Sequence, residues 1–257
     1  MGDLVLQACL NGVRLADAHP GLPISPYQLA QDARAVAELG VRSVHVHPRC
    51  ALGLETIDPD CVGEVIAAIR SVVPAIEVAV PSARWVAPDP ARRVEAVHRW
   101  GRLGSGARPD VVAVSVHEHG WWQVCAAACA VGIGVEVGVW TPGDAVRLRQ
   151  GGLPAGVVRV VAEVTVGDPV IAIAEADRIL RALGPVRVPV LLHGEDHAAW
   201  SVWAHAAAMG LHTRVGLEDM LTRPDGCPTH GNPDLVEHAL RTRARALCEP
   251  PRQQVYR

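Results

Sequence analysis

The chain has 257 residues, 49% of them hydrophobic, and its formal net charge is −3. This is enough apolar sequence for a large core, and no basic stretch with interleaved aromatic residues is present, so a nucleic-acid partner is not expected. The longest apolar stretch, 124–140, is broken by Glu136 and several glycines, so no membrane span is expected.

Short runs rich in Val, Leu and Ile alternate with stretches of helical spacing along the chain. In chain order, the predicted strands are 4–10, 43–47, 76–80, 111–116, 134–138, 157–161, 190–193 and 212–215. The helices predicted after them are 26–39, 59–72, 90–103, 121–131, 142–150, 169–183, 197–209 and 232–247. Five of these helices begin with Pro after Ser, Asp or Thr, a pair typical of helix starts.

Eight strand–helix pairs in about 250 residues are the repeat number and size of a (β/α)8 TIM barrel. A doubly wound parallel sheet is the alternative, but it normally has fewer repeats, and no Gly-x-Gly-x-x-Gly follows a predicted strand. The sequence therefore predicts one α/β domain over residues 1–257, a (β/α)8 barrel. An irregular tail from about residue 248 could pack on a neighbouring subunit.

The scattered cysteines indicate the redox environment of the protein, and the absence of Lys disfavours several classes of enzyme. The seven cysteines are scattered and form no C-x-x-C pair, and the N-terminal residues lack the basic region of a signal peptide, so we expect a reduced, cytoplasmic protein.

The chain contains no Lys, so Arg supplies all of its Lys-or-Arg side chains. Schiff-base aldolases, pyridoxal-phosphate enzymes and P-loop NTPases each depend on a lysine and are disfavoured. Carbon–carbon bond chemistry would need a metal or an acid–base pair.

Two histidines stand two residues apart in the second predicted strand. In a strand, His45 and His47 project to the same side, about 7 Å apart along the chain. Two imidazoles on one face can bind a divalent metal when a third ligand comes from elsewhere. The alternative is that both are ordinary hydrogen-bonded histidines inside the barrel.

The end of the eighth predicted strand supplies a third ligand, because the active site of such barrels lies at the C-terminal ends of the strands. Glu218 completes a set of two histidines and one carboxylate, which leaves positions open for substrate. The adjacent Asp219 could act as a base, and Arg214 offers a planar fork for a carboxylate. The alternative is a salt-bridged loop that caps the last helix, and the two strand histidines favour the metal site.

A rival ligand pair follows the seventh predicted strand. His193 and Glu195 could also bind a metal, but Glu195 lies past the strand end, which makes this pair the weaker candidate. Other polar residues at strand ends are Asn11, Arg14, Ser82, Arg84, Ser115 and Glu136.

Blocks of sequence along nearly the whole chain resemble the β-keto acid cleavage enzyme family, which includes 3-keto-5-aminohexanoate cleavage enzyme. The matching blocks are Ala8-Cys-Leu-Asn-Gly12, His19-Pro-Gly-Leu-Pro-Ile-Ser-Pro26, Val44-His-Val-His-Pro-Arg49, Val135-Glu-Val-Gly138, Arg214-Val-Gly-Leu-Glu-Asp219, Pro224-Asp-Gly226 and Asn232-Pro-Asp-Leu-Val236. The resemblance implies a zinc-dependent (β/α)8 barrel, commonly a homo-oligomer. It implies an enzyme that condenses a β-keto acid with acetyl-CoA to give acetoacetate and a new acyl-CoA.

The resemblance also implies residue roles. His45, His47 and Glu218 would bind zinc, Asp219 would be the base, and Arg214 would lie near the substrate carboxylate. Glu136 matches an acidic residue of the family site, and Ser82 is a further match in the catalytic set. Substrate-binding positions are Asn11, Arg14, Arg84 and Ser115.

This chain departs from the family pattern around the substrate. Arg14 stands where family members carry Glu, and Ser115 where Asn is common. The Ser-Thr-Gly-Gly-like turn after the third strand reads Pro81-Ser-Ala-Arg84. Arg14 and Arg84 would add positive charge, which favours a more anionic keto acid. Two other functions stay open: a metal-dependent hydrolase or isomerase that uses metal-bound water, and a non-catalytic metal-binding relative.

Overall fold

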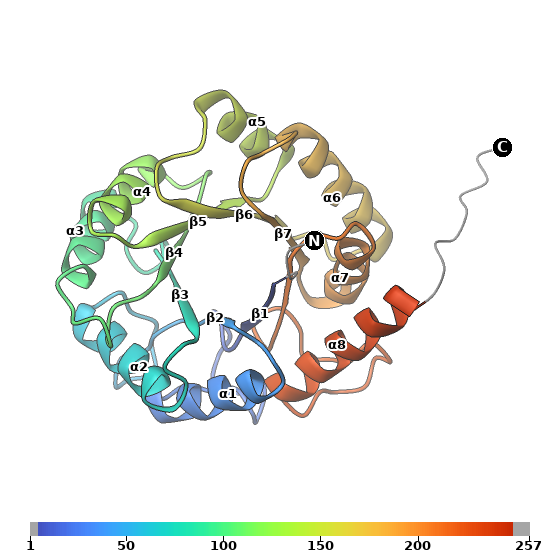
Figure 1. The fold of residues 1–257 in the computed structure, drawn as a ribbon, viewed down its shortest axis with the longest axis horizontal. Helices are drawn as coiled ribbons and strands as arrows, with labels where there is room; N and C mark the ends of the chain where they lie inside the picture. Colours follow the sequence, from blue (N-terminus) through green and yellow to red (C-terminus); the bar gives the residue numbers. More distant parts are fainter. Residues whose placement is uncertain (1–4, 249–257) are drawn as a thin grey trace.

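The computed structural model describes residues 5–248, and in this range parallel strands form a nearly closed barrel inside a ring of helices (Figure 1). The strands are β1 (Leu6–Cys9), β2 (Ser43–His45), β3 (Glu77–Pro81), β4 (Val111–Ser115), β5 (Gly134–Val139), β6 (Val157–Val164), β7 (Val190–Gly194) and β8 (Thr213–Val215). The prediction of a (β/α)8 TIM barrel is confirmed.

The strand order follows the chain around the barrel. Neighbouring strands pair in the order β7-β6-β5-β4-β3-β2-β1-β8, and each pairing is parallel. A parallel bridge between Leu191 and His212 brings the remaining two edges together. The C-terminal ends of all these strands therefore open on one face, where the functional residues of such barrels gather.

The helices cover the outside of the barrel. They are α1 (Pro26–Glu38), α2 (Pro59–Val72), α3 (Pro90–Trp100), α4 (Trp121–Ala130), α5 (Pro142–Gly151), α6 (Pro169–Leu183), α7 (Ala199–Ala208) and α8 (Asn232–Cys248). The five predicted Pro starts are confirmed, with side chains such as that of Ser25 capping the first backbone N–H groups. None of these helices combines the length and apolarity that crossing a membrane requires.

Several boundaries differ from the predictions. β2 ends at His45 rather than at residue 47, although the Val46 N–H still donates to the Ala79 carbonyl at 3.0 Å. β6 runs three residues further than predicted, to Val164. The helix predicted over 197–209 is divided into a 3-10 turn, η1 (Asp196–Ala198), and α7, and the first residue of η1, Asp196, has a φ of +46°. Residue 4 and the predicted tail lie outside the described residues.

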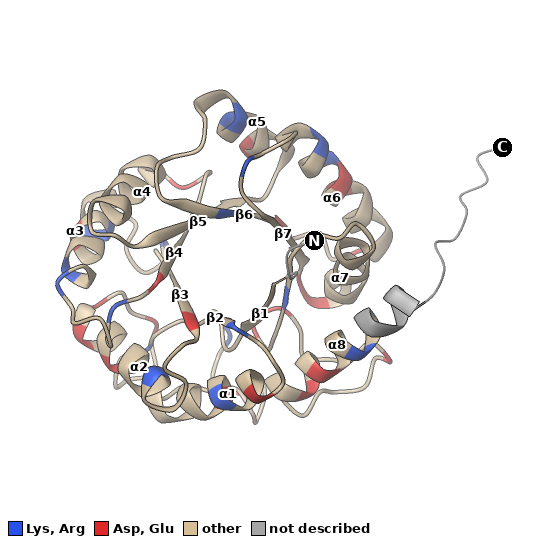
Figure 2. Cartoon of the chain, viewed as in Figure 1, with Lys and Arg blue, Asp and Glu red and all other residues tan. Residues whose placement is uncertain are grey.

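The barrel interior is polar near the N-terminal ends of the strands. Gln7 and Arg159 each donate to one carboxylate oxygen of Glu136, at 2.8 and 2.6 Å. Arg159 also pairs with Glu77, which accepts a 2.7 Å hydrogen bond from Ser43. We call these five residues the lower polar layer. Around the outer helices, arginines and acidic residues are interspersed (Figure 2).

Candidate metal centre and substrate pocket

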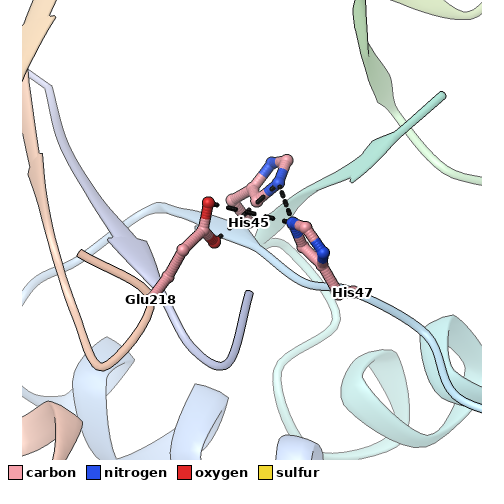
Figure 3. Close-up of side chains that lie close together, drawn as sticks. All are labelled: His45, His47 and Glu218. Carbon is pink, nitrogen blue, oxygen red and sulfur yellow. Dashed lines mark hydrogen bonds and ion pairs between the residues drawn. The ribbon is translucent and has the colours of Figure 1, made fainter. Parts of the chain in front are cut away.

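The three residues predicted to bind a metal lie together at the C-terminal ends of β2 and β8 (Figure 3). The Nε2 atoms of His45 and His47 are 3.1 Å apart. The Glu218 carboxylate faces both rings, with Oε2 at 3.9 Å from His45 Nε2 and Oε1 at 3.8 Å from His47 Nε2. One ligand atom from each residue lies within 4.8 Å of the others.

This arrangement fits a divalent metal. Two nitrogens bound to tetrahedral zinc at 2.0–2.1 Å lie about 3.3 Å apart, close to the distance between the two rings. Glu218 Oε2 is buried and has no hydrogen-bond partner. Burial lowers the pKa of His45 to about 3, so the ring is neutral, as a metal ligand must be. Burial raises the pKa of Glu218, but Arg214 and three histidines outweigh it and hold the pKa at about 2.

The local backbone fixes these ligands. Asn11 donates to the His47 carbonyl and accepts from the His47 N–H, both at 2.9 Å, so it holds the end of β2 beside β1. Gly12 has a φ of +56°, and a Cβ there would lie 2.4 Å from Glu218 Cγ. At Gly216 a Cβ would lie 2.0 Å from the Cys9 carbonyl oxygen. Both glycines let the β1 and β8 loops approach closely enough to place Glu218.

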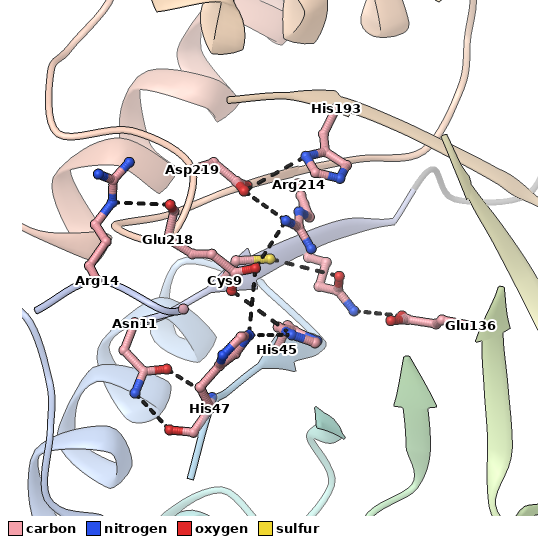
Figure 4. A network of polar contacts seen from close by, with 12 residues as sticks. Cys9, Asn11, Arg14, His45, His47, Glu136, His193, Arg214, Glu218 and Asp219 are labelled. Atoms are coloured by element: carbon pink, nitrogen blue, oxygen red, sulfur yellow. Dashed lines mark hydrogen bonds and ion pairs between the residues drawn. The ribbon is translucent and has the colours of Figure 1, made fainter. Parts of the chain in front are cut away.

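Arg214 joins Glu218 to Asp219 (Figure 4). Its Nη2 donates to Glu218 Oε1 at 3.0 Å and to Asp219 Oδ1 at 2.8 Å. Burial raises the pKa of Asp219 to about 6, against the opposing charges of Arg214 and His193. Asp219 has 0% exposed surface, and its Oδ2 lacks a hydrogen-bond partner. Asp219 therefore lies behind Arg214, outside the cavity lining, with one carboxylate oxygen unpaired.

His193, on β7, lies between two carboxylates. Its Nδ1 is 3.7 Å from Asp219 Oδ1 and its Nε2 is 3.5 Å from Glu163 Oε2, and neither nitrogen has a hydrogen-bond partner. Burial, together with the charge of Arg214, lowers the pKa of His193 to about 4. His193 and Glu195 are thus not part of the ligand set around His45, and His193 instead packs against the Arg214–Asp219 pair. We call His45, His193, Arg214, Glu218 and Asp219 the upper polar cluster.

A cavity of about 340 Å³ opens beside the candidate metal ligands. Two tryptophans, Trp85 and Trp140, contribute to its wall, and Glu163 and Glu195 lie elsewhere along it. Burial and the neighbouring charge of Glu163 together raise the pKa of Glu195 to about 7. The cavity thus combines an aromatic wall with two neighbouring carboxyl groups whose pKa values are raised, mainly by burial.

The predicted substrate-binding residues differ in their placement. Ser115 and Arg14 line the cavity. The Arg14 guanidinium is occupied, since its Nη2 pairs with Asp196 at 2.6 Å and its Nε donates to the Leu217 carbonyl at 2.6 Å. Arg84 is exposed and does not belong to the cavity lining, so the positive charge expected from these two arginines is compensated or turned away.

Two further predicted residues, Ser82 and Glu136, are buried away from the lining. The Ser82 hydroxyl donates to Glu118 Oε2 at 3.3 Å, and Arg93 donates to the same oxygen at 2.5 Å. Glu136 is the third residue of β5 rather than its last, so it lies in the lower polar layer.

Glu55 and Trp85 belong to the surroundings of His47, although no sequence pattern indicates them. Glu55 Oε2 is 2.8 Å from His47 Nδ1, and Trp85 Nε1 donates to the same oxygen at 2.8 Å. No spacing rule links residues 47, 55 and 85. The one available signal was the altered turn at Pro81–Arg84, which Trp85 follows directly.

The sequence model of the beta-keto acid cleavage enzyme family matches residues 3–255. This chain belongs to that family. The match covers all three metal-ligand candidates and the Arg214–Asp219 pair, so the family resemblance read from the motifs is confirmed.

Solved structures show the same fold at low sequence identity. The apo structure of ObcA is 18% identical with a TM-score of 0.63, over 89% of this chain and 62% of that chain. A ternary complex of ObcA with a C4-CoA adduct and oxalate is 16% identical with a TM-score of 0.63, over 89% and 64%. This chain therefore spans less than two thirds of the length of the ObcA chains. The 3-dehydroquinate dehydratase from Geobacillus kaustophilus is 12% identical with a TM-score of 0.63, over 95% and 92%.

Proposed function

We propose that this family member is a zinc-dependent acyltransferase that condenses a β-keto acid with acetyl-CoA and releases acetoacetate and a new acyl-CoA. The observation that carries the proposal is the His45–His47–Glu218 set beside the Arg214–Asp219 pair, within a chain of this family. ObcA, which shares the fold, has been captured with a C4-CoA adduct and with oxaloacetate. Those ligands support a CoA thioester and a β-keto acid as the reactants here.

When bound, the metal would polarise the β-keto oxygen as a Lewis acid. Asp219 would take the proton from C2, the carbon between the ketone and the carboxylate. A carboxyl group with a pKa of about 6 suits this task, because its conjugate base is populated at neutral pH and is still basic enough to accept a proton. Arg214 covers Asp219 and would orient the substrate carboxylate, exchanging one of its two protein partners for the substrate.

The atoms of the reaction balance without a further reactant. C2 of the keto acid forms a bond to the acetyl carbonyl carbon, and the CoA thiolate leaves. The thiolate then attacks the ketone carbon, the bond between that carbon and C2 breaks, and C2 regains its proton. The products are acetoacetate and the acyl-CoA of the remaining fragment. No lysine is needed at any step, which agrees with the composition.

Asn11, Ser115 and Arg14 complete the proposed site. Asn11 holds the backbone of the metal ligand His47. Ser115 lines the cavity and could donate to the substrate. Because Asp196 already pairs with Arg14, we do not assign Arg14 a free positive charge, and a strongly anionic substrate gains less from it than the sequence indicated. We further propose a cytoplasmic homo-oligomer, which the family resemblance implies and sedimentation would test.

A turnover screen tests the function. Zinc-loaded protein is mixed with a panel of β-keto acids, with and without acetyl-CoA, and acyl-CoA products are followed by mass spectrometry. We expect acetyl-CoA-dependent acetoacetate, lost in His45→Ala and Asp219→Ala and kept in Glu64→Gln, an exposed change on α2. Product without acetyl-CoA would favour a hydrolase or isomerase. Zinc binding with no turnover of any acid would favour a non-catalytic relative.

A further inference from the structure

The metal ligand His47 has a second hydrogen-bond partner on the side away from the metal site. Its Nδ1 lies 2.8 Å from Glu55 Oε2, and both side chains are largely buried, at 4% and 12% exposed. A carboxylate only accepts hydrogen bonds, so His47 must carry its proton on Nδ1. The lone pair of Nε2 then points toward His45 and Glu218, as metal binding requires.

Trp85 contacts both members of this pair. Its indole N–H, which can only donate, binds Glu55 Oε2 at 2.8 Å. Its ring stacks on the His47 ring, with centroids 5.8 Å apart and planes at 18°. One carboxylate oxygen thus receives two donors, and the imidazole is fixed both at its edge and on its face. Trp85 is also half exposed and lines the cavity, so it separates His47 from solvent on that side.

The local backbone brings Glu55 back to His47. After β2 the chain makes a short antiparallel hairpin, in which Arg49 pairs with Glu55. The Cys50 N–H donates to the Leu54 carbonyl at 2.8 Å, and Gly53 closes the turn with a φ of +76°. The Arg49 side chain fixes the hairpin to the β1 loop through the carbonyls of Gly12 and Arg14, at 2.9 and 2.6 Å. Glu55 is therefore placed by the loop that follows the ligand it contacts.

Trp85 comes from a strained turn after β3. Ala83 is 2% exposed and has a φ of +51°, a conformation that is unfavourable for a residue with a Cβ. The Val86 and Ala87 N–H groups both donate to the Ala83 carbonyl, at 3.0 and 2.9 Å. Strain of this kind persists where the surrounding contacts over-determine the backbone. Here the turn directs Trp85 toward Glu55 on the neighbouring loop.

We propose that Glu55 and Trp85 form a positioning pair for the metal site, in which Glu55 fixes the tautomer and orientation of His47 and Trp85 fixes Glu55. The proposal rests on the metal site of the proposed function, and it adds two residues that act through His47 rather than on the substrate. Carboxylate partners of ligating histidines typically change metal affinity by about 10- to 100-fold when removed. The effect should therefore be measurable in the affinity of the protein for zinc.

The experiment measures zinc affinity of the full chain, stripped of metal, by competition with a chromophoric chelator. Glu55→Ala should weaken zinc binding by about 10- to 100-fold. Glu55→Gln should stay within about threefold of the unmodified protein, because its amide oxygen can accept both hydrogen bonds. Trp85→Phe, which keeps a stacking ring but loses the N–H donor, should weaken binding several-fold. Glu64→Ala, an exposed acid on α2, is the matched control.

The combined variant shows whether Trp85 acts through Glu55. In a Glu55→Ala background, Trp85→Phe should cause no further loss, since the hydrogen bond it removes is already gone. Cobalt(II) spectra of each variant report the geometry of the bound ion independently of turnover. An equal effect of Trp85→Phe in both backgrounds would overturn the pairing.

The two proposals fail in distinguishable ways. If Glu55→Ala binds zinc as tightly as the unmodified protein, the positioning role is wrong while the metal site stands. If the unmodified protein binds no divalent metal, both the metal site and the positioning pair are wrong. Should Glu55→Ala not fold, a Trp85→Phe variant with unchanged zinc affinity and cobalt spectrum also overturns the proposal.

Discussion

The barrel contains two groups of buried charged residues that differ in how well they are satisfied. In the lower polar layer, the carboxylates of Glu136 and Glu77 share the guanidinium of Arg159, and none of the side-chain polar atoms of this layer is buried without a partner. In the upper polar cluster, six buried atoms lack a hydrogen-bond partner. They are His45 Nδ1, both ring nitrogens of His193, Arg214 Nε, Glu218 Oε2 and Asp219 Oδ2.

This difference in hydrogen bonding indicates that the two groups have different roles. A buried polar atom without a partner costs about 1–3 kcal/mol, so a fold retains such atoms where something else makes use of them. Complete pairing marks the lower layer as part of the barrel's stability. Incomplete pairing in the upper cluster agrees with the metal and substrate site proposed there. Substitutions in the upper cluster should therefore reduce turnover, whereas substitutions in the lower layer should reduce stability.

The largest effect should come from the upper cluster. In Asp219→Asn, kcat should fall by about 10²- to 10⁴-fold, because the side chain can no longer accept the C2 proton. Zinc affinity should change little, since all three ligands remain. Steady-state kinetics and chelator competition measure the two quantities. Turnover within threefold of the unmodified enzyme would show that another group is the base.

A change in the lower layer should instead reduce stability. Arg159→Ala leaves the buried carboxylate of Glu136 and the partly exposed carboxylate of Glu77 without their cation. It should lower the free energy of unfolding by about 3–5 kcal/mol, because Glu136 then keeps a buried charge without a partner. Zinc affinity of the folded fraction should be unchanged. Urea denaturation measures the loss. A loss under 1 kcal/mol would contradict the structural role of this layer.

A third change tests the carboxyl pair in the cavity. Burial and Glu163 raise the pKa of Glu195 from 4.5 to about 7, so the folded protein holds this proton more tightly than the unfolded chain. The stabilisation is fully present below pH 4.5 and is lost as the pH rises through about 7. The Glu195→Gln side chain keeps a hydrogen-bond donor toward Glu163, but it does not gain or lose a proton in this pH range. Relative to that of the unmodified protein, the free energy of unfolding of the Glu195→Gln variant should therefore rise by about 3 kcal/mol between pH 4.5 and 8. Denaturation at several pH values measures this change. A difference in free energy of unfolding between the two proteins that stays constant from pH 4.5 to 8 would contradict the expectation.

The smallest effect concerns the backbone beside Glu218, one of the three proposed metal ligands. Gly12→Ala places a methyl carbon 2.4 Å from Glu218 Cγ, so the Glu218 side chain must shift, and zinc binding should weaken by about tenfold. Gly132→Ala is the control, because Gly132 also has a positive φ, +72°, but nothing lies within 4 Å of a Cβ there. Equal zinc affinities in the two variants would show that Gly12 does not govern the position of Glu218.

Local sequence rules predicted the parts of this protein that depend on local chemistry. Pro after Ser, Asp or Thr located five helix starts, and strand alternation brought His45 and His47 together. Glu218 could be predicted because the ends of parallel barrel strands share one face. Positions along a strand were less predictable: Glu136 is grouped with the residues at strand ends, but it is the third residue both of the predicted strand 134–138 and of β5, and it lies in the lower layer.

Contacts between loops could not be predicted in this way. The pairing of Glu55 with Trp85 depends on a hairpin after β2 and a strained turn after β3, and no periodicity relates the two. The same holds for Arg14, whose pairing with Asp196 joins the loops after β1 and β7. The charge that such an arginine offers to a ligand depends on partners that a single sequence does not reveal.

The exclusive use of arginine has a practical consequence for handling this protein. No side chain carries a primary amine, so succinimidyl esters and aldehyde fixatives have no lysine to modify. Guanidinium groups stay protonated even when buried, so the cations at Arg159 and Arg214 persist over the whole working pH range. Amine-directed coupling through the backbone terminus would thus leave every charge of the barrel in place, and a surface-bound preparation should keep its metal site intact.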